Sequence, residues 1–204
     1  TAALLSCDVK NIEHDITETF NCDLNGLYQT KNIKTVLCAE GLLTEKGFII
    51  KNKDEKYALG HVKDLTGFSG RWDVIAEHPT IITDVAHNED GIKQLLEQLS
   101  IVKCATSRLH MVIGMVKDKD VSKVLSILPK DTAYYFSNAH IDRAMPHQDL
   151  KEKAKDFGLN GESYDDVNDA INAARKNAAA KDIIIVCGSV FLIAEVDTDL
   201  FRNI

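Results

Sequence analysis

The sequence predicts an α/β protein whose main part is an open, mostly parallel sheet with helices on both faces. Three features predict it: apolar runs of strand length in the second half of the chain, amphipathic helices between them, and little polar alternation inside the runs. The runs are residues 80–85, 110–116, 132–136 and 183–187. Uninterrupted Ile and Val are typical of strands covered on both faces, and parallel strands joined through helices form right-handed crossovers.

The connections between these runs carry apolar residues at the i, i+3, i+4 and i+7 spacing of an amphipathic helix. The stripes are Ile92, Leu95, Leu96 and Leu99; Val121, Val124, Leu125 and Leu128; and Val167, Ala170, Ile171 and Ala174. A weaker helix is expected over residues 148–157, with Leu150 and Ala154 inward, and a short edge strand near 162–164. Strands that alternate with helices in this order predict a Rossmann-like layered sheet.

The first seventy residues have a different pattern. Residues 23–29 look extended, and a helix with apolar residues at helical spacing from Ile33 to Leu43 follows them. The polar run 51–56 is expected to be a surface turn or linker, and a short helix should cover residues 57–65. One amphipathic helix with a few extended pieces cannot enclose a core of its own. This part therefore resembles the end of a larger domain.

Two glycines, Gly67 and Gly70, mark the expected boundary between the two parts, because glycine clusters punctuate regular structure. We expect residues 1–66 to be the remnant of one domain with its linker, and residues 67–204 to be a complete second domain.

Composition restricts the class of protein further. The net charge is −7, and Lys and Arg do not cluster on one element, which argues against a nucleic-acid partner. No run approaches the roughly 18 apolar residues of a membrane helix, and the start lacks the features of a secretory signal. The five cysteines are scattered without a Cys-x-x-Cys pair, which favours a reducing, cytoplasmic setting over disulfides or a structural zinc site. We therefore expect no membrane partner and no metal ligands in this chain.

Polar residues gather where the predicted strands end. In an open parallel sheet, ligands bind at the carboxyl ends of the strands. The residues expected there are Asp84, His87, Asn88, Lys117, Asp118, Lys119, Asp120, Arg143 and Ser189. Asp84 follows an apolar strand, so its carboxylate must find hydrogen-bond partners or stay solvated in a cleft. His87 follows three residues later, and the two polar side chains together at a strand end favour a functional site.

Local sequence also explains several of these residues without a ligand. Asn88 and Asp118 are typical helix N-caps, and so is Ser189 after a glycine. A helix N-terminus with a serine hydroxyl is equally suited to an anion, so both interpretations of Ser189 stay open. The chain carries neither a Gly-x-x-x-x-Gly-Lys-Ser/Thr loop nor a Gly-x-Gly-x-x-Gly fingerprint nor a serine nucleophile elbow. These absences argue against a self-contained nucleotide hydrolase, a dehydrogenase or an α/β-hydrolase.

Several motifs, in this order, resemble the C-terminal part of the folylpolyglutamate synthase/dihydrofolate synthase branch of the Mur ligases. They are Gly70-Arg71-Trp72, Asp84-Val85-Ala86-His87-Asn88, Gly114-Met115-Val116-Lys117-Asp118-Lys119-Asp120 and Cys187-Gly188-Ser189. The stretch from Asp23 to Asn32 is similar to the end of the family's central ATP-binding domain. The resemblance spans nearly the whole chain, and the motifs together are far more specific than any one alone.

The resemblance implies an ATP-dependent ligase. Such enzymes phosphorylate a carboxylate of dihydropteroate or of a folate glutamyl tail, and the amine of L-glutamate attacks the acyl phosphate. By motif, Asn32 with Gln29 would contact the adenine, Arg71 would reach the ATP phosphates, and Asp84 would hold the ribose hydroxyls. His87 would lie toward the glutamate and the acyl phosphate. Arg71 and His87 are thus the expected catalytic residues.

Asn88 and Ser189 are expected near the glutamate, and the loop 117–120 and Arg143 receive no role. ATP and Mg²⁺ are the expected cofactors. The family's phosphate loop, magnesium ligands and carbamylated lysine lie in an N-terminal domain whose motifs are not found here. We therefore expect a C-terminal fragment that is inactive alone, from an enzyme that is a monomer. Two alternatives remain: another Mur-type amino-acid ligase, and a non-enzymatic α/β module that binds a small anion or a nucleotide.

Overall fold

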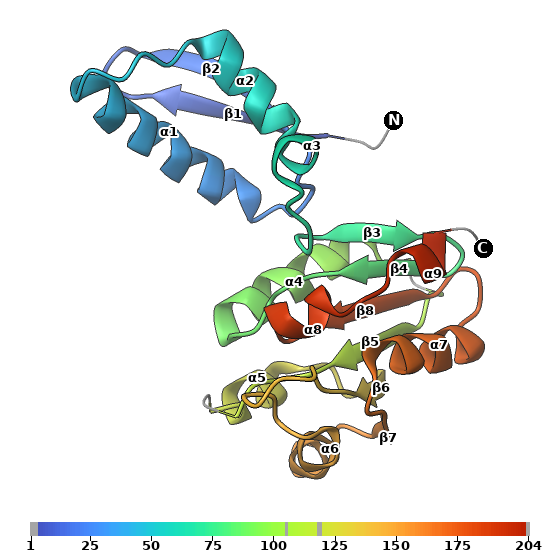
Figure 1. The fold of residues 1–204 in the computed structure, drawn as a ribbon. Coiled ribbons are helices and arrows are strands. Elements are labelled where there is room, and N and C mark those ends of the chain that lie inside the picture. Colours follow the sequence, from blue (N-terminus) through green and yellow to red (C-terminus); the bar gives the residue numbers. More distant parts are fainter. Residues whose placement is uncertain (1–3, 105, 118–119, 203–204) are drawn as a thin grey trace. The chain divides into compact units, whose positions relative to one another are not determined.

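The computed structural model describes residues 4–104, 106–117 and 120–202 and divides the chain into two compact units (Figure 1). The first unit is residues 1–71 and the second is residues 72–204. The domain boundary expected from the sequence lies between residues 66 and 67, and the assignment of the first unit to an ATP-binding domain stays a prediction.

The first unit is a β-hairpin accompanied by three helices. Its elements are β1 (Leu5–Asn11), β2 (Ile16–Cys22), α1 (Gln29–Glu45), α2 (Asn52–Gly60) and α3 (Val62–Thr66). The predicted helix after residue 29 is confirmed. The prediction of a surface turn at 51–56 is wrong, because α2 begins at Asn52, and Asp54 and Glu55 in its first turn favour a helix N-terminus there.

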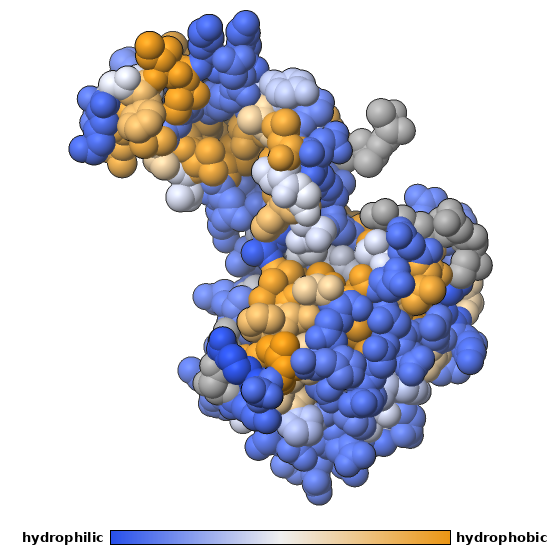
Figure 2. Space-filling view, in the orientation of Figure 1, coloured by the Kyte–Doolittle hydropathy of each residue, from blue (hydrophilic) through white to orange (hydrophobic). Residues whose placement is uncertain are grey.

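The core of this unit is small. Its buried apolar residues are Phe20, Cys22, Leu24, Ile33 and Leu59. Large apolar side chains remain outside it, such as Ile49 at 89% exposure, and Figure 2 shows apolar side chains on the visible face of this unit. The hairpin was not foreseen, although Leu5, Cys7 and Val9 alternate with polar residues, which is the pattern of a half-buried strand.

The second unit contains a six-stranded sheet in the order β3-β4-β8-β5-β6-β7. Its strands are β3 (Asp73–Ala76), β4 (Thr80–Thr83), β5 (Leu109–Ile113), β6 (Ala133–Phe136), β7 (Gly161–Ser163) and β8 (Ile183–Cys187). Strand β3 pairs antiparallel with β4, and the other neighbours pair in parallel. The predicted open, mostly parallel sheet is confirmed, including the edge strand β7, whereas the antiparallel edge strand β3 was missed.

Helices cover both faces of this sheet. They are α4 (Glu89–Val102), α5 (Ser122–Ile127), α6 (His147–Lys155), α7 (Val167–Asn177), α8 (Val190–Ala194) and α9 (Asp199–Arg202). Alternate residues of one strand enter different cores, because successive side chains point to opposite faces. Ile185 packs with residues of α4, α5 and α6, whereas Ile184 and Val186 pack with residues of α7, α8 and α9. The predicted helical stripes are therefore confirmed as core.

The position of β8 determines which loops meet. The chain passes from β4 through α4 to β5, but these two strands are not neighbours in the sheet. Strand β8 lies between them, and its Ile185 is paired with Ile82 of β4 and with Met111 of β5. The loops that follow β4, β8 and β5 consequently adjoin at the carboxyl edge of the sheet (Figure 1). Within the described part of the chain, no helix has the length and apolarity needed to cross a membrane.

Candidate functional site

The three central loops of the carboxyl edge are joined by backbone hydrogen bonds. Gly188 N–H donates to the Ala86 carbonyl at 2.8 Å, and Gly114 N–H donates to the Cys187 carbonyl at 3.2 Å. Gly188 has φ +106°, and a Cβ atom there would lie 2.3 Å from the Gly114 carbonyl oxygen. Glycine is therefore required at this crossing, both for its conformation and for the close approach of two backbones.

Asp84 lies at the end of β4 with a buried, hydrogen-bonded carboxylate. Its exposure is 2%, Oδ2 accepts the Trp72 N–H at 2.9 Å, and Oδ1 accepts the Ala86 N–H at 2.8 Å. Burial raises the pKa of the nearby Cys187 thiol far above its usual range, and the charge of Asp84 adds to this effect. The sequence allowed the carboxylate either hydrogen-bond partners or a solvated cleft. In the structure it is buried and accepts hydrogen bonds from the backbone.

His87 has one ring nitrogen fixed by its own loop. Nδ1 lies 2.9 Å from the Val85 carbonyl oxygen. Because a carbonyl oxygen only accepts, Nδ1 carries the hydrogen of the neutral ring, and Nε2 presents a lone pair. The side chain is half-buried and lines a pocket, so the imidazole lies at the expected edge of the sheet.

The capping predictions for the two helix starts are confirmed. Asn88 Oδ1 accepts the Gly91 N–H at 2.8 Å at the start of α4, and Ser189 Oγ accepts the Phe191 N–H at 3.2 Å at the start of α8. Asn88 is exposed, whereas Ser189 is buried. Both side chains therefore stabilise their helices, and a contact with glutamate stays a prediction for each.

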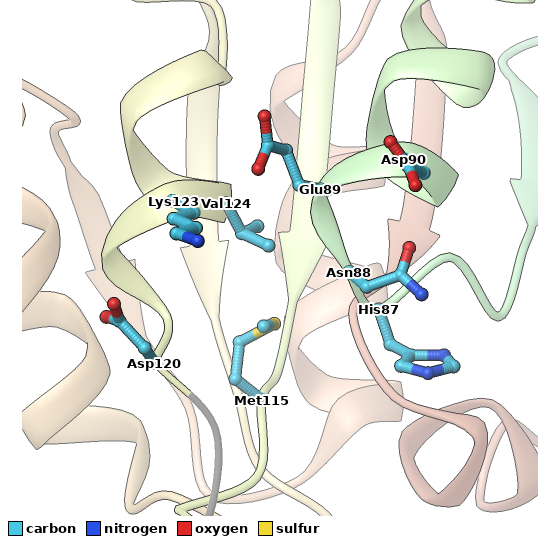
Figure 3. Close-up of a pocket in the computed structure, with 8 residues that line it drawn as sticks. All are labelled: His87, Asn88, Glu89, Asp90, Met115, Asp120, Lys123 and Val124. Carbon is cyan, nitrogen blue, oxygen red and sulfur yellow. The ribbon is translucent and has the colours of Figure 1, made fainter.

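A pocket of about 420 Å³ lies between the loop after β4 and the loop after β5. Its lining residues are His87, Asn88, Glu89, Asp90, Met115, Asp120, Lys123 and Val124 (Figure 3). Figure 3 shows Asp120 and Lys123 on the α5 side, facing Asn88 and Glu89 on the α4 side. Lys123 was not foreseen as a site residue, although its place in the first turn of a helix after this loop could have indicated it.

Several charges of the pocket already have partners. Glu89 Oε1 accepts from Lys93 Nζ at 2.6 Å, which holds the pKa of Glu89 below its usual range. The Asp120 carboxylate accepts the Ser122 N–H at 3.0 Å, and this bond lowers the pKa of Asp120. Among the described residues, no three His, Cys, Asp or Glu side chains gather as metal ligands.

The loops after β5 and β6 pair with each other. Lys117 N–H donates to the Arg143 carbonyl at 2.8 Å, and Lys117 Nζ donates to the Asp142 carbonyl at 3.0 Å. The Arg143 guanidinium lies 5.9 Å from the ring centroid of Phe191, near enough for a cation–π contact. Lys117 and Arg143 are thus brought together by backbone bonds, while Asp118 and Lys119 lie outside the described residues.

The expected site residues of the first unit are local neighbours. Asn32 Nδ2 donates to Gln29 Oε1 at 2.7 Å, within the first turn of α1. Gln29 is buried and Asn32 is exposed. The Arg71 guanidinium lies 5.4 Å from the ring centroid of Phe68 and is half-buried. Their contacts with a nucleotide stay predictions.

The sheet order, the glycine crossing and the pocket together describe an α/β domain with a polar pocket at the carboxyl edge of its sheet. Residues 70–190 match the family model described as "Mur ligase, glutamate ligase domain". The match covers more than half of the chain, and the chain belongs to the Mur ligase family. The resemblance read from the sequence motifs is thereby confirmed.

Relatives indicate the branch of this family. The dihydrofolate synthase/folylpolyglutamate synthase of Bacillus subtilis is 28% identical over 187 residues, which are 90% of this chain and 42% of that protein. The Escherichia coli structure described as FolC in complex with DHPP and ADP has a TM-score of 0.65 at 27% identity and covers 83% of this chain and 38% of that one. This chain therefore spans less than half the length of these relatives.

A third match has a nucleotide analogue and a metal ion bound. It is the bifunctional folylpolyglutamate synthase/dihydrofolate synthase of Yersinia pestis complexed with AMPPNP and Mn, with a TM-score of 0.63 at 25% identity. The match covers 79% of this chain and 37% of that one. The similarity indicates the C-terminal domain of a folylpolyglutamate/dihydrofolate synthase.

Proposed function

We propose that this chain is the C-terminal part of an ATP-dependent ligase that adds L-glutamate to dihydropteroate or to a folate. In the proposed reaction the substrate carboxylate attacks the γ-phosphorus of ATP, ADP leaves, and an acyl phosphate forms. The glutamate amine then attacks the acyl carbon, phosphate leaves, and an amide bond results. The observation that carries the proposal is the meeting of three motif loops at one sheet edge in a Mur ligase domain.

The residues that the family resemblance singles out suit a reaction that concentrates negative charge and needs a free amine. Arg71 would stabilise the phosphates, because a preformed cation favours the charge that develops in phosphoryl and acyl transfer. His87 presents the Nε2 lone pair, which can accept a hydrogen bond or a proton from the glutamate ammonium. Gln29 and Asn32 would contact the adenine, while Asn88 and Ser189 would lie beside the glutamate.

ATP and a divalent metal are the proposed cofactors, on the strength of the AMPPNP and Mn bound by the Yersinia relative. When bound, a divalent cation neutralises phosphate charge and orients the transferred group. By the family resemblance, we propose that the metal's protein ligands belong to the N-terminal domain of the full-length ligase.

The test compares a full-length protein that contains this chain with the 204-residue chain alone. Each is incubated with ATP, Mg²⁺, dihydropteroate or a folate, and radiolabelled L-glutamate, and product formation and phosphate release are measured. We expect glutamate addition by the full-length protein and none by the chain alone. Activity of the isolated chain would contradict the assignment as a partial ligase.

The identity of the amino-acid substrate is tested with a panel of amino acids. A panel with L-glutamate, L-alanine, D-glutamate and diaminopimelate, offered to the full-length protein, separates the folate branch from other Mur-type ligases. Folate-independent ligation of a different amino acid would replace the folate assignment. Nucleotide binding without any ligation would instead support a non-enzymatic binding module.

A further inference from the structure

A buried polar network lies in the second unit near the amino ends of β5 and β8, at the opposite edge of the sheet from the candidate site. Its members are His110 on β5, Tyr135 on β6, Asn177 at the end of α7 and Asp182 just before β8. We propose that these four side chains, named here the amino-edge lock, join their elements through one ordered chain of hydrogen bonds while His110 is neutral, and that protonation of His110 breaks the chain. The lock lies within one unit and does not depend on the ligase reaction.

The four side chains contact one another in a row. Asn177 Nδ2 lies 3.1 Å from Tyr135 Oη, and Tyr135 Oη lies 3.1 Å from His110 Nδ1. His110 Nε2 lies 3.6 Å from Asp182 Oδ2, slightly beyond hydrogen-bond distance. His110 and Tyr135 are each 4% exposed and Asp182 is 3% exposed, so these groups depend on one another rather than on solvent.

Asp182 is the negative end of this row. Its Oδ1 accepts the Arg108 N–H at 2.9 Å, and its Oδ2 accepts the Ala179 N–H at 2.7 Å. Burial alone would raise the pKa of Asp182, but these two bonds and the nearby His110 ring outweigh burial and hold the pKa below its usual range. The carboxylate is therefore ionised at neutral pH and presents negative charge to Nε2 of His110.

This charge determines which nitrogen of neutral His110 carries the hydrogen. A lone pair on Nε2 would face the carboxylate and be repelled, so Nε2 carries the hydrogen and Nδ1 has the lone pair. The Tyr135 hydroxyl then donates to Nδ1, and its oxygen accepts from the Asn177 amide. Every donor in the row points toward Asp182, and hydrogen bonds ordered in this way strengthen one another.

Protonation of His110 reverses one step of this chain. Nδ1 becomes a donor, so the Tyr135 hydroxyl loses its acceptor, and its oxygen faces donors from both His110 and Asn177. A buried hydrogen bond that is left unmade destabilises the folded state. Burial also lowers the pKa of His110 below its usual range, although the charge of Asp182 opposes this effect. The folded state therefore favours the neutral ring.

The titratable and charged groups around His110 come from the elements packed against it. The turn before β8 contributes Asp182, whose charge favours protonation, and the residue before β5 is Arg108, whose charge opposes it. Strand β6 contributes Tyr135, and burial raises the pKa of this hydroxyl, so it stays neutral. The ring centroid of Tyr164 lies 6.2 Å from that of Tyr135. The contact from α7 is an uncharged amide.

The turn that contains Asp182 fastens the middle of the sheet. The Thr80 N–H at the start of β4 donates to the Asp182 carbonyl at 3.1 Å, and the Ile183 N–H donates to the Arg108 carbonyl at 3.0 Å. Strand β8 lies between β4 and β5, so these bonds attach the amino end of a central strand to both neighbours. The lock connects α7 and β6 to this turn, and a break at the His110 ring separates them from it.

Tyr135, His110 and Asp182 also stand in the order of nucleophile, base and orienting acid that covalent catalysis uses. A substrate would have to reach the tyrosine hydroxyl, but Tyr135 is 4% exposed. Ligands of a parallel sheet bind at the carboxyl ends of the strands, which is the other edge. The row of groups therefore acts within the fold rather than on a substrate.

Nitrogen NMR of the histidine rings in the 204-residue chain gives the first test. At about pH 8 the His110 ring, identified by its absence from the spectrum of His110→Asn, should be the Nε2–H tautomer. Its protonation midpoint should lie below 6.5, whereas the hydrogen bond to Glu195 raises the pKa of exposed His140 above that value. An Nδ1–H tautomer, or a His110 midpoint at or above that of His140, would overturn the lock.

Two substitutions should move the His110 midpoint in opposite directions. Tyr135→Phe removes the donor that stabilises the lone pair of neutral Nδ1, so the midpoint should rise. Asp182→Asn removes the charge that favours the imidazolium, so the midpoint should fall. If Nδ1 were the donor instead, Tyr135→Phe would leave the midpoint unchanged or lower it, and either result would contradict the ordered chain.

Urea denaturation at several pH values measures what the lock contributes to stability. The assay follows the fluorescence of Trp72, the single tryptophan of the sequence, which is buried in the second unit. Because the pKa of folded His110 lies below its usual 6.5, the contribution is complete above about pH 6.5 and is lost as the pH falls through the folded pKa. The folding equilibrium constant should fall by up to about tenfold per pH unit in this window.

The variant His110→Asn removes the titrating ring and keeps an amide oxygen as an acceptor for Tyr135. Between about pH 6.5 and about pH 4.5, above the usual 3.8 of Asp182, its stability should fall less than that of the wild type. His140→Asn is the matched control. The raised pKa of His140 gives a contribution that is present below pH 6.5 and lost as the pH rises, so its removal leaves the acid-induced fall at least as steep. Equally steep falls in the wild type and in His110→Asn would overturn the lock.

Discussion

The substitution Gly188→Ala tests the tight crossing of loops at the carboxyl edge. Gly188 has φ +106°, and the nearest atom to an added Cβ is the Gly114 carbonyl oxygen, at 2.3 Å, where an ordinary contact is 3.4–4 Å. The obstacle is backbone, and Gly114 is itself bonded to Cys187 through its N–H. The new methyl group therefore cannot be accommodated by rotation of a side chain.

The expected loss has two parts. A left-handed backbone at a residue with a Cβ costs about 1–2 kcal/mol. Forcing extra volume into a packed site costs about 1–3 kcal/mol more. Gly188→Ala should therefore lower the free energy of unfolding of the second unit by about 2–5 kcal/mol. Gly158→Ala is the control, because Gly158 has φ +75° and its nearest contact is the Lys130 side chain at 3.7 Å, so only the first part applies.

The assay is urea denaturation followed by tryptophan fluorescence. The sequence contains one tryptophan, and Trp72 is buried in the second unit, so its emission reports this unit alone. We expect Gly158→Ala to lower the free energy of unfolding by about 1–2 kcal/mol and Gly188→Ala to lower it by clearly more. Equal losses in the two variants would refute the reasoning about the backbone approach.

Three further predictions concern buried polar groups and a helix cap. Tyr135→Phe removes the hydroxyl that lies 3.1 Å from Nδ1 of buried His110, and it should lower the stability of the second unit by about 1–3 kcal/mol in urea denaturation. Burial, the hydrogen bond to Glu40 and neighbouring carboxylates raise the pKa of Glu55 to about 7. Its protonated form stabilises the first unit below about pH 4.5, and this contribution is lost as the pH rises through about 7. Glu55→Gln should therefore slow hydrogen exchange in α2 at pH 8, relative to the wild type at the same pH, and not at pH 4. Asp166→Ala removes the acceptor for the Asn168 N–H at 2.7 Å at the start of α7 and should cost about 1 kcal/mol, measured by the same urea titration.

The main fold was predictable because its signals are local. Strands buried on both faces need continuous apolar residues, and their covering helices need one apolar stripe, so 183–187 and the stripe from Val167 to Ala174 were recognised correctly. Elements with weak local sequence signals were missed, because the prediction depended on those signals. Strand β3 has four residues, Asp73–Ala76, and lies at the edge of its sheet with Val74 half exposed, so its apolar run is too short to give a clear signal.

The candidate site was predictable only as a set of loops. A strand end with Asp84, His87 and Asn88 indicates polar chemistry, and the motif order indicates the family. What each side chain contacts was not predictable, because the partners come from elsewhere. The N–H of Trp72 lies twelve residues before Asp84, and Lys123 enters the pocket from another helix.

Asp84, at the end of β4, shows what the sequence determines and what only the tertiary structure determines. The sequence alone determined that a carboxylate follows a buried strand and therefore needs partners, since an ionised group without them is not stable in a protein interior. Only the tertiary structure decided that the partners are the backbone N–H groups of Trp72 and Ala86. It also decided that β8 enters between β4 and β5, because strand order depends on how distant segments pack against one another.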